Sequence, residues 1–148
     1  MQPVFRIRNL SVCIKGKTLL EIDALDIPAG STAVIGPNGA GKSTLLRALI
    51  GQAGQGEITL LGEAAAPQIR AGKAAWVGQH GRYNMPMTVR EYIALAAFVQ
   101  KGRLNHEWAD ELLNYFDLAA LAEKRISRLS GGEQQRANII RALLQNAP

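Results

Sequence analysis

A glycine-rich segment in the first third of the chain has the residue types that bind phosphate. Residues 36–44 read GPNGAGKST and satisfy the pattern G-x-x-x-x-G-K-[ST]. The glycines let successive backbone N–H groups turn toward a polyphosphate, and a helix that starts at the end of the loop adds unpaired N–H groups and the positive end of its dipole. The residues expected to surround the phosphates are Gly36, Asn38, Gly39, Ala40, Gly41, Lys42, Ser43 and Thr44.

Two side chains at the end of this loop have separate roles in such a site. Lys42 would place a point charge beside the β- and γ-phosphates of a nucleotide, and the Ser43 hydroxyl would complete the octahedral shell of a Mg²⁺ ion. Both are binding roles, not nucleophilic ones. The loop alone fits a nucleotide kinase, a GTPase, a motor or a transporter ATPase, so it predicts the ligand and not the task.

A second motif lies close to the C-terminal end, where residues 129–136 read LSGGEQQR. Ser130 and Glu133 form the Ser-x-x-Glu pattern of a capping box, which by itself is usually only a helix cap. Gly131 and Gly132 indicate more, because glycine costs about 1 kcal/mol inside a helix and is expected there only where something approaches the backbone closely. We therefore expect a second helix start that binds an anion.

The elements that position these motifs change in character along the chain. Lys15, Gly16 and Lys17 predict a turn between the first two strands, and the leucines after Lys42 predict a helix that stops at Gly51. The segments with the alternation or short apolar runs of strands are 4–12, 20–27, 32–35, 57–61 and 74–77.

The second half of the chain is expected to be helical. Thr88 and Glu91 form a capping box that opens one helix, Asn105 caps a second over 106–116, and Ser130 opens a third that ends by about Asn146. The apolar side chains expected to face the core of the first two helices are Tyr92, Ile93, Leu95, Ala96, Val99, Trp108, Leu112 and Tyr115 or Phe116.

Composition restricts the class of protein further. The 148 residues are 47% hydrophobic and 20% charged, which is typical of one globular domain and excludes bulk disorder. The longest nearly apolar stretch, 93–99, is far shorter than the roughly 20 residues of a membrane span, and the start has no signal-peptide core, so we expect a cytoplasmic chain. Cys13 is the only cysteine and cannot form an internal disulfide. The net charge of +5 is scattered and fits an anionic ligand or an ordinary solvated surface.

Taken in order, GPNGAGKST and LSGGE resemble the Walker A loop and the signature motif of the nucleotide-binding domains of ABC transporter ATPases, and the resemblance covers the whole chain. It implies an α/β P-loop fold with an N-terminal antiparallel β-subdomain and a helical subdomain. The implied parts are a β-subdomain and P-loop core over about 1–80, a helical subdomain over about 81–130 and the signature helix over 131–148. The sheet is expected to be incomplete, because the family's strands after the signature helix are not in the sequence.

The resemblance also implies a set of ligands and roles. ATP and Mg²⁺ would bind the Walker A loop, with Gln79 of the Q-loop sensing Mg²⁺ and the γ-phosphate. Two subunits would pair head to tail, so that Ser130, Gly131, Gly132 and Glu133 of one subunit hold the ATP bound by the other. Ile14 falls where the family has an aromatic residue on adenine, and an aliphatic side chain there forgoes about 0.5–1.5 kcal/mol of ring stacking. We therefore expect weak discrimination between ATP and GTP.

Two departures from the family pattern bear on activity. Glu133 replaces the usual signature glutamine, which is a mild change because glutamate still serves the cap. The sequence also stops before the Walker B strand, whose Asp helps to hold Mg²⁺ and whose Glu polarises the attacking water. We expect the 148-residue chain to be marginally stable and nearly inactive as an ATPase.

The favoured function is the energising subunit of an ABC importer, coupling ATP binding and hydrolysis to solute import through a membrane permease on the inner face of the cell membrane. Residues 83–92, YNMPMTVREY, look like those of importers of metal ions or metal chelates. One alternative is a non-catalytic nucleotide-binding remnant. The other is a soluble ABC protein acting on nucleic acid or ribosomes; nucleic acid is not expected, because only 87 residues separate Lys42 from Ser130 and they contain no sustained heptads.

Overall fold

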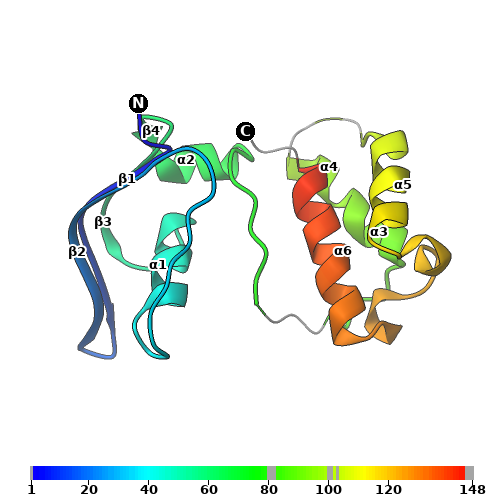
Figure 1. The fold of residues 1–148 in the computed structure, drawn as a ribbon, viewed down its shortest axis with the longest axis horizontal. Helices are drawn as coiled ribbons and strands as arrows, with labels where there is room; N and C mark the ends of the chain where they lie inside the picture. The colour runs from blue at the N-terminus through cyan, green and yellow to red at the C-terminus, as the bar shows by residue number, and fades with distance from the viewer. Residues whose placement is uncertain (1, 80–82, 100–101, 103, 146–148) are drawn as a thin grey trace. The chain divides into compact units, whose positions relative to one another are not determined.

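The structure is a computed structural model that describes residues 2–79, 83–99, 102 and 104–145. The chain forms two compact units, of which the first ends at Arg70 and the second begins at Ala71. Figure 1 shows the elements that make up each unit. The finer division into three parts expected from the sequence stays a prediction.

The first unit is built on a four-stranded antiparallel sheet in the order β2-β1-β3-β4. Its strands are β1 (Phe5–Ile14), β2 (Lys17–Ile27), β3 (Gln55–Leu60) and β4 (Glu63–Ala64). In the hairpin of β1 and β2, Phe5 lies opposite Ile27 and Ile14 opposite Lys17, so a two-residue turn joins the strands. The expected antiparallel pair and the expected strand near 57–61 are therefore confirmed.

The helix α1 (Lys42–Leu49) packs against β1 and β2, and the short helix α2 (Ala65–Arg70) follows β4. The buried residues of α1 are spaced by three and four positions, which places them on one face of the helix. Together with one face of β1 they form the core of this unit, whose buried side chains are Ile7, Leu10, Val12, Leu45, Ala48 and Leu49. Since α1 ends before Gly51, its start and stop are as expected.

Two other expected strands do not form. Residues 32–35 have no regular secondary structure and all four are exposed, Ile35 to 91%. Residues 74–77 also lie outside any strand. Both predictions are wrong for a common reason. An apolar run becomes a strand only where a neighbouring strand accepts and donates its backbone hydrogen bonds, and no described residue does so for these two segments.

The second unit is helical. Its α-helices are α3 (Val89–Ala94), α4 (Ala96–Val99), α5 (His106–Tyr115) and α6 (Gly131–Leu144), and two 3₁₀ turns, η1 (Ala119–Leu121) and η2 (Ile126–Arg128), connect α5 to α6. The helix expected from Thr88 onward divides at Leu95, and the helix expected after Asn105 is confirmed, with its cap. The helix α6 ends at Leu144, within the described residues, which agrees with the expected end by about Asn146. Among those that are described, no helix is long and apolar enough to cross a membrane.

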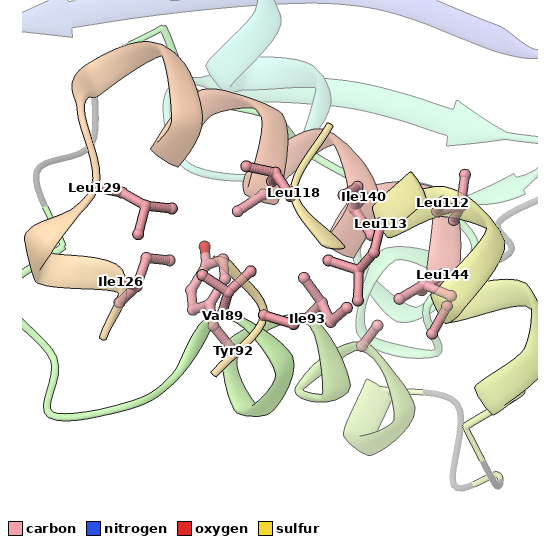
Figure 2. Packing of buried hydrophobic residues seen from close by; sticks show 14 residues of the cluster. Val89, Tyr92, Ile93, Leu112, Leu113, Leu118, Ile126, Leu129, Ile140 and Leu144 are labelled. Carbon is pink, nitrogen blue, oxygen red and sulfur yellow. The ribbon is translucent and has the colours of Figure 1, made fainter. Parts of the chain in front are cut away.

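The signature helix α6 lies against α3, α4 and α5 and completes their core (Figure 1). Figure 2 shows the buried side chains of this cluster. Most of them come from α3, α4, α5 and α6, and a few come from the turns before α6. Tyr92 of α3 donates its hydroxyl hydrogen to Asn138 Oδ1 of α6, both being buried. Burial raises the pKa of Tyr92 to about 12, so this hydroxyl stays a donor.

Trp108 is not a core residue, contrary to the expectation. Its side chain is 41% exposed, whereas Ala109, Leu112 and Leu113 are buried and Phe116 packs against the cluster. The buried residues follow the i, i+3, i+4, i+7 spacing from Ala109, and Trp108, four residues before Leu112, lies at the edge of that face. The core stripe of α5 is therefore set by aliphatic residues, not by its largest aromatic one.

Candidate nucleotide-binding site

The phosphate loop leads directly into α1, as its sequence pattern requires. Gly39 and Gly41 adopt φ values of 86° and 87°, in the left-handed region that favours glycine. A Cβ added at Gly41 would also lie 3.3 Å from Leu20 Cδ1 of β2. Within the loop, the Ala40 N–H donates to Pro37 O at 3.2 Å, and the first bond of the helix runs from Leu45 N to Gly41 O at 2.8 Å.

The start of α1 is open to a ligand. Its N-cap is Gly41, which gives no side-chain cap, and its first turn has no acidic residue. In the described part of the chain no backbone carbonyl accepts from the N–H groups of Lys42, Ser43 and Thr44. By contrast, α3, α5 and α6 each begin with a side-chain cap. The unpaired N–H groups and the positive end of the helix dipole at α1 therefore favour an anion.

Lys42 supplies a full positive charge to this loop. Its Nζ donates to Gly36 O and Pro37 O, each at 2.7 Å, so the ammonium group folds back over the loop. Backbone carbonyls are weaker partners for an ammonium group than phosphate oxygens, which carry negative charge. The loop thus combines a cation with unpaired N–H groups, a donor set that fits a triphosphate, and the exposed Ser43 hydroxyl adds an oxygen ligand of the kind that Mg²⁺ takes.

The remaining candidates of the first unit are accessible. Asn38 and Ala40 are exposed in the loop. Ile14 is the last residue of β1, immediately before the hairpin turn, and 54% of its surface is exposed. An exposed aliphatic side chain at this position can cover one face of a base.

The second candidate helix start, at α6, forms the expected capping box. Glu133 Oε2 accepts from the Ser130 N–H at 2.7 Å and from the Ser130 hydroxyl at 2.8 Å. Both hydrogen bonds hold the pKa of Glu133 below its usual range, and the bond from the Ser130 hydroxyl has the larger effect. Glu133 therefore carries its negative charge at the helix start at neutral pH.

The fold of this unit does not itself require glycine at the two positions after Ser130. Gly131 and Gly132 are exposed, neither has a positive φ, and a Cβ at either would meet no heavy atom within 4 Å. Beside them is a hollow of about 580 Å³ lined by Tyr83, Asn84, Ser127, Leu129, Ser130, Gly131 and Gln134. Glycines with no reason in the fold are consistent with a ligand that approaches the helix start from outside.

Gln79 lies at the end of an irregular segment that α6 holds in place. Gln135 Nε2 donates to Gly78 O at 3.3 Å, next to Gln79, which is itself exposed. Gln145 Nε2 donates to Gly72 O at 3.3 Å and to Ala74 O at 2.9 Å. Sequence reasoning missed these two glutamines, because contacts between residues 57 to 73 positions apart leave no local pattern.

The predicted site residues are divided between the two units. The phosphate-loop residues and Ile14 belong to the first unit, and Gln79 and the signature residues belong to the second. In each group the motif lies at the start of a helix, as predicted.

The fold matches that of known nucleotide-binding domains of ABC transporters. The solved "Structure of ATP binding subunit of ABC transporter" is 26% identical, with a TM-score of 0.83 over 98% of this chain and 63% of that one. A second solved structure, "An inward-facing conformation of a putative metal-chelate type ABC transporter", is also 26% identical, with a TM-score of 0.70 over 99% of this chain and 57% of that one. The α/β P-loop fold expected from the sequence is confirmed.

A family model described as ABC transporter matches residues 20–148, and the chain belongs to this family. It is 39% identical over 153 residues to "Hemin import ATP-binding protein HmuV" of Bradyrhizobium diazoefficiens, covering 99% of this chain and 57% of that protein. It is 36% identical over 151 residues to "Zinc import ATP-binding protein ZnuC 1" of Hahella chejuensis, covering 99% of this chain and 53% of that protein. The chain therefore spans somewhat more than half the length of these relatives.

Proposed function

We propose that this chain is the nucleotide-binding part of an ATP-binding subunit of an ABC importer, which couples ATP binding and hydrolysis to solute import through a membrane permease. The observation that carries the proposal is the open start of α1, where unpaired N–H groups and the Lys42 ammonium group converge on one loop. Relatives named for hemin import and zinc import favour a metal ion or a metal chelate as the cargo.

In this proposal the phosphate loop holds the triphosphate of ATP. The N–H groups at the start of α1 and the charge of Lys42 bind phosphate oxygens, and the Ser43 hydroxyl would be a ligand of Mg²⁺. When bound, Mg²⁺ would neutralise charge that develops on the phosphate oxygens. The contribution of Lys42 is positional as well as electrostatic, since its ammonium group already lies over the loop. Ile14 covers the adenine without stacking on it.

The second part of the site is proposed to come from another copy or a similar subunit. Ser130, Gly131 and Gly132 would bind the ATP of the partner in a head-to-tail pair, and Glu133 lies at the same helix start as its cap. Two helix starts directed at one triphosphate stabilise its charge better than one does. The open surface around Gly131 and Gly132 supports this, because a partner's phosphate has room to approach.

The proposed partners are therefore the permease and a second ATP-binding subunit, with the chain bound peripherally to the inner face of the membrane and with no nucleic acid.

The proposal is tested by nucleotide binding to the chain and to Lys42→Ala, measured by calorimetry with Mg²⁺ and ATP. Loss of a charge-assisted contact of about 1.5–3 kcal/mol should weaken binding at least tenfold. Lys73→Ala is the matched control, because Lys73 is an exposed lysine outside the loop. Equal affinities for ATP in the parent chain and in Lys42→Ala would refute the proposed phosphate site.

A further inference from the structure

The start of α6 is closed by a carboxylate of its own chain. Glu133 Oε2 accepts from both donors of Ser130, the N–H at 2.7 Å and the hydroxyl at 2.8 Å. In return, the Glu133 N–H reaches Ser130 Oγ only at 3.4 Å, beyond the usual range of such a bond. A single carboxylate oxygen thus occupies the position from which an external anion would bind Ser130.

The capping box of α3 is an internal comparison. Glu91 Oε2 accepts from the Thr88 N–H at 2.7 Å, and the Thr88 hydroxyl accepts from the Glu91 N–H at 3.1 Å. In that box the hydroxyl mainly serves the helix. In the box of α6 the Ser130 hydroxyl donates to the carboxylate instead, so it is already engaged as the donor that a phosphate would need.

Nothing else in the described part of the second unit closes this helix start. Gly131 and Gly132 are exposed with open space around them, and no described backbone carbonyl accepts from their N–H groups. The charged groups that act on Glu133 are Lys124 and Arg136, both cationic, and they favour its ionised form together with the bonds from Ser130. Among the described residues, the negative charge at this helix start comes from Glu133.

We propose that Glu133 is a built-in competitor for the phosphate that binds at the start of α6. This inference rests on the proposed function, in which a second copy brings its ATP to this helix start. A phosphate oxygen that takes the Ser130 hydroxyl must displace Glu133 Oε2, and the displaced carboxylate still repels it. Glutamine at this position would keep the capping box but remove the negative charge. Glu133 thus sets the ATP concentration at which a phosphate binds at the start of α6.

The test is Glu133→Gln in the 148-residue chain, with Glu91→Gln as the matched control. ATP and Mg²⁺ are titrated into each chain at one protein concentration, and amide NMR shifts are followed. Shifts of Gly131 and Gly132 report binding at α6, and shifts of residues 39–43 report binding at the phosphate loop. Half-saturation at α6 should occur at about tenfold less ATP in Glu133→Gln than in the parent, the equivalent of one charge-assisted hydrogen bond, with Glu91→Gln unchanged.

Two results would overturn the proposal. One is equal half-saturation at α6 in the parent and in Glu133→Gln, and the other is no shift of Gly131 or Gly132 in any of the three chains. The proposed function fails in a different way, with no shift of residues 39–43. Thermal unfolding followed by circular dichroism checks that α6 is retained. Each variant keeps a glutamine in its capping box, so the two variants should lose similar stability.

Discussion

The two glycines at the start of α6 allow a prediction in which stability and ligand binding change in opposite directions. Gly132 has no positive φ, and a Cβ at this position would meet no heavy atom within 4 Å, so Gly132→Ala introduces neither backbone strain nor a clash. A Gly→Ala change at such a position stabilises a protein by about 0.4–1 kcal/mol, mainly by lowering the entropy of the unfolded chain. Gly132→Ala should therefore be more stable than the parent chain.

Binding should weaken in the same variant. The added methyl group lies beside the Gly131 and Gly132 N–H groups, where the proposed phosphate must approach the backbone. Urea unfolding followed by far-UV circular dichroism measures the stability, and the shifts of the Gly131 amide on titration with ATP and Mg²⁺ measure the binding. We expect a higher midpoint in urea together with a higher half-saturation by ATP.

Gly41→Ala is the control with the opposite effect on stability. Gly41 has a φ of 87°, and a Cβ there would lie 3.3 Å from Leu20 Cδ1, so the change should cost about 1–2 kcal/mol for the left-handed conformation alone. If Gly132→Ala proves more stable and binds ATP at α6 as well as the parent does, the glycines have no role in binding, and the interpretation of this helix start as a phosphate site is wrong. If Gly132→Ala is less stable than the parent chain, the open space described around Gly132 is contradicted.

Two further changes test the base contact and the core. Ile14→Tyr should tighten ATP binding by about 0.5–1.5 kcal/mol, because a ring can stack on the adenine where the aliphatic chain cannot. Competition between ATP and GTP for the parent and the variant measures this, and unchanged affinities would remove Ile14 from the base site. Leu113→Ala should cost about 2–5 kcal/mol of stability, because Leu113 is almost fully buried in the cluster of Figure 2. Trp108→Ala should cost much less, since 41% of that side chain is exposed, and equal losses in urea unfolding would contradict the assigned core face of α5.

Local patterns predicted those parts of the structure that depend on local interactions. Both capping boxes form as expected, because their partners are three residues apart and bond within one turn. The hairpin of β1 and β2 also follows from alternation and a short turn. The strand predicted over 32–35 does not form, because a strand needs a partner that its own sequence cannot specify.

The site shows the same division between local and distant interactions. The phosphate loop was predictable, since its glycines and its helix are contiguous in the sequence. The hydrogen bonds by which Gln135 and Gln145 hold the segment before Gln79 were not, because they join positions that only the packing of α6 brings close. The exposure of Trp108 does not follow from spacing alone, because Trp108 and Leu112 are four residues apart and spacing does not show that the buried face is centred nearer Ala109.

The contrast between the two helix starts implies an order of events. At α1 the N–H groups are unpaired and a cation lies over the loop, so a triphosphate binds there without displacing any charged group. At α6 the donors of Ser130 are already bonded to Glu133, so a phosphate gains there only the difference between its own bonds and those that it breaks. Free nucleotide should therefore fill the phosphate loop first. The start of α6 then binds only a triphosphate that is already held by a second copy. Such an immobilised ligand has lost most of its translational freedom before it competes with Glu133.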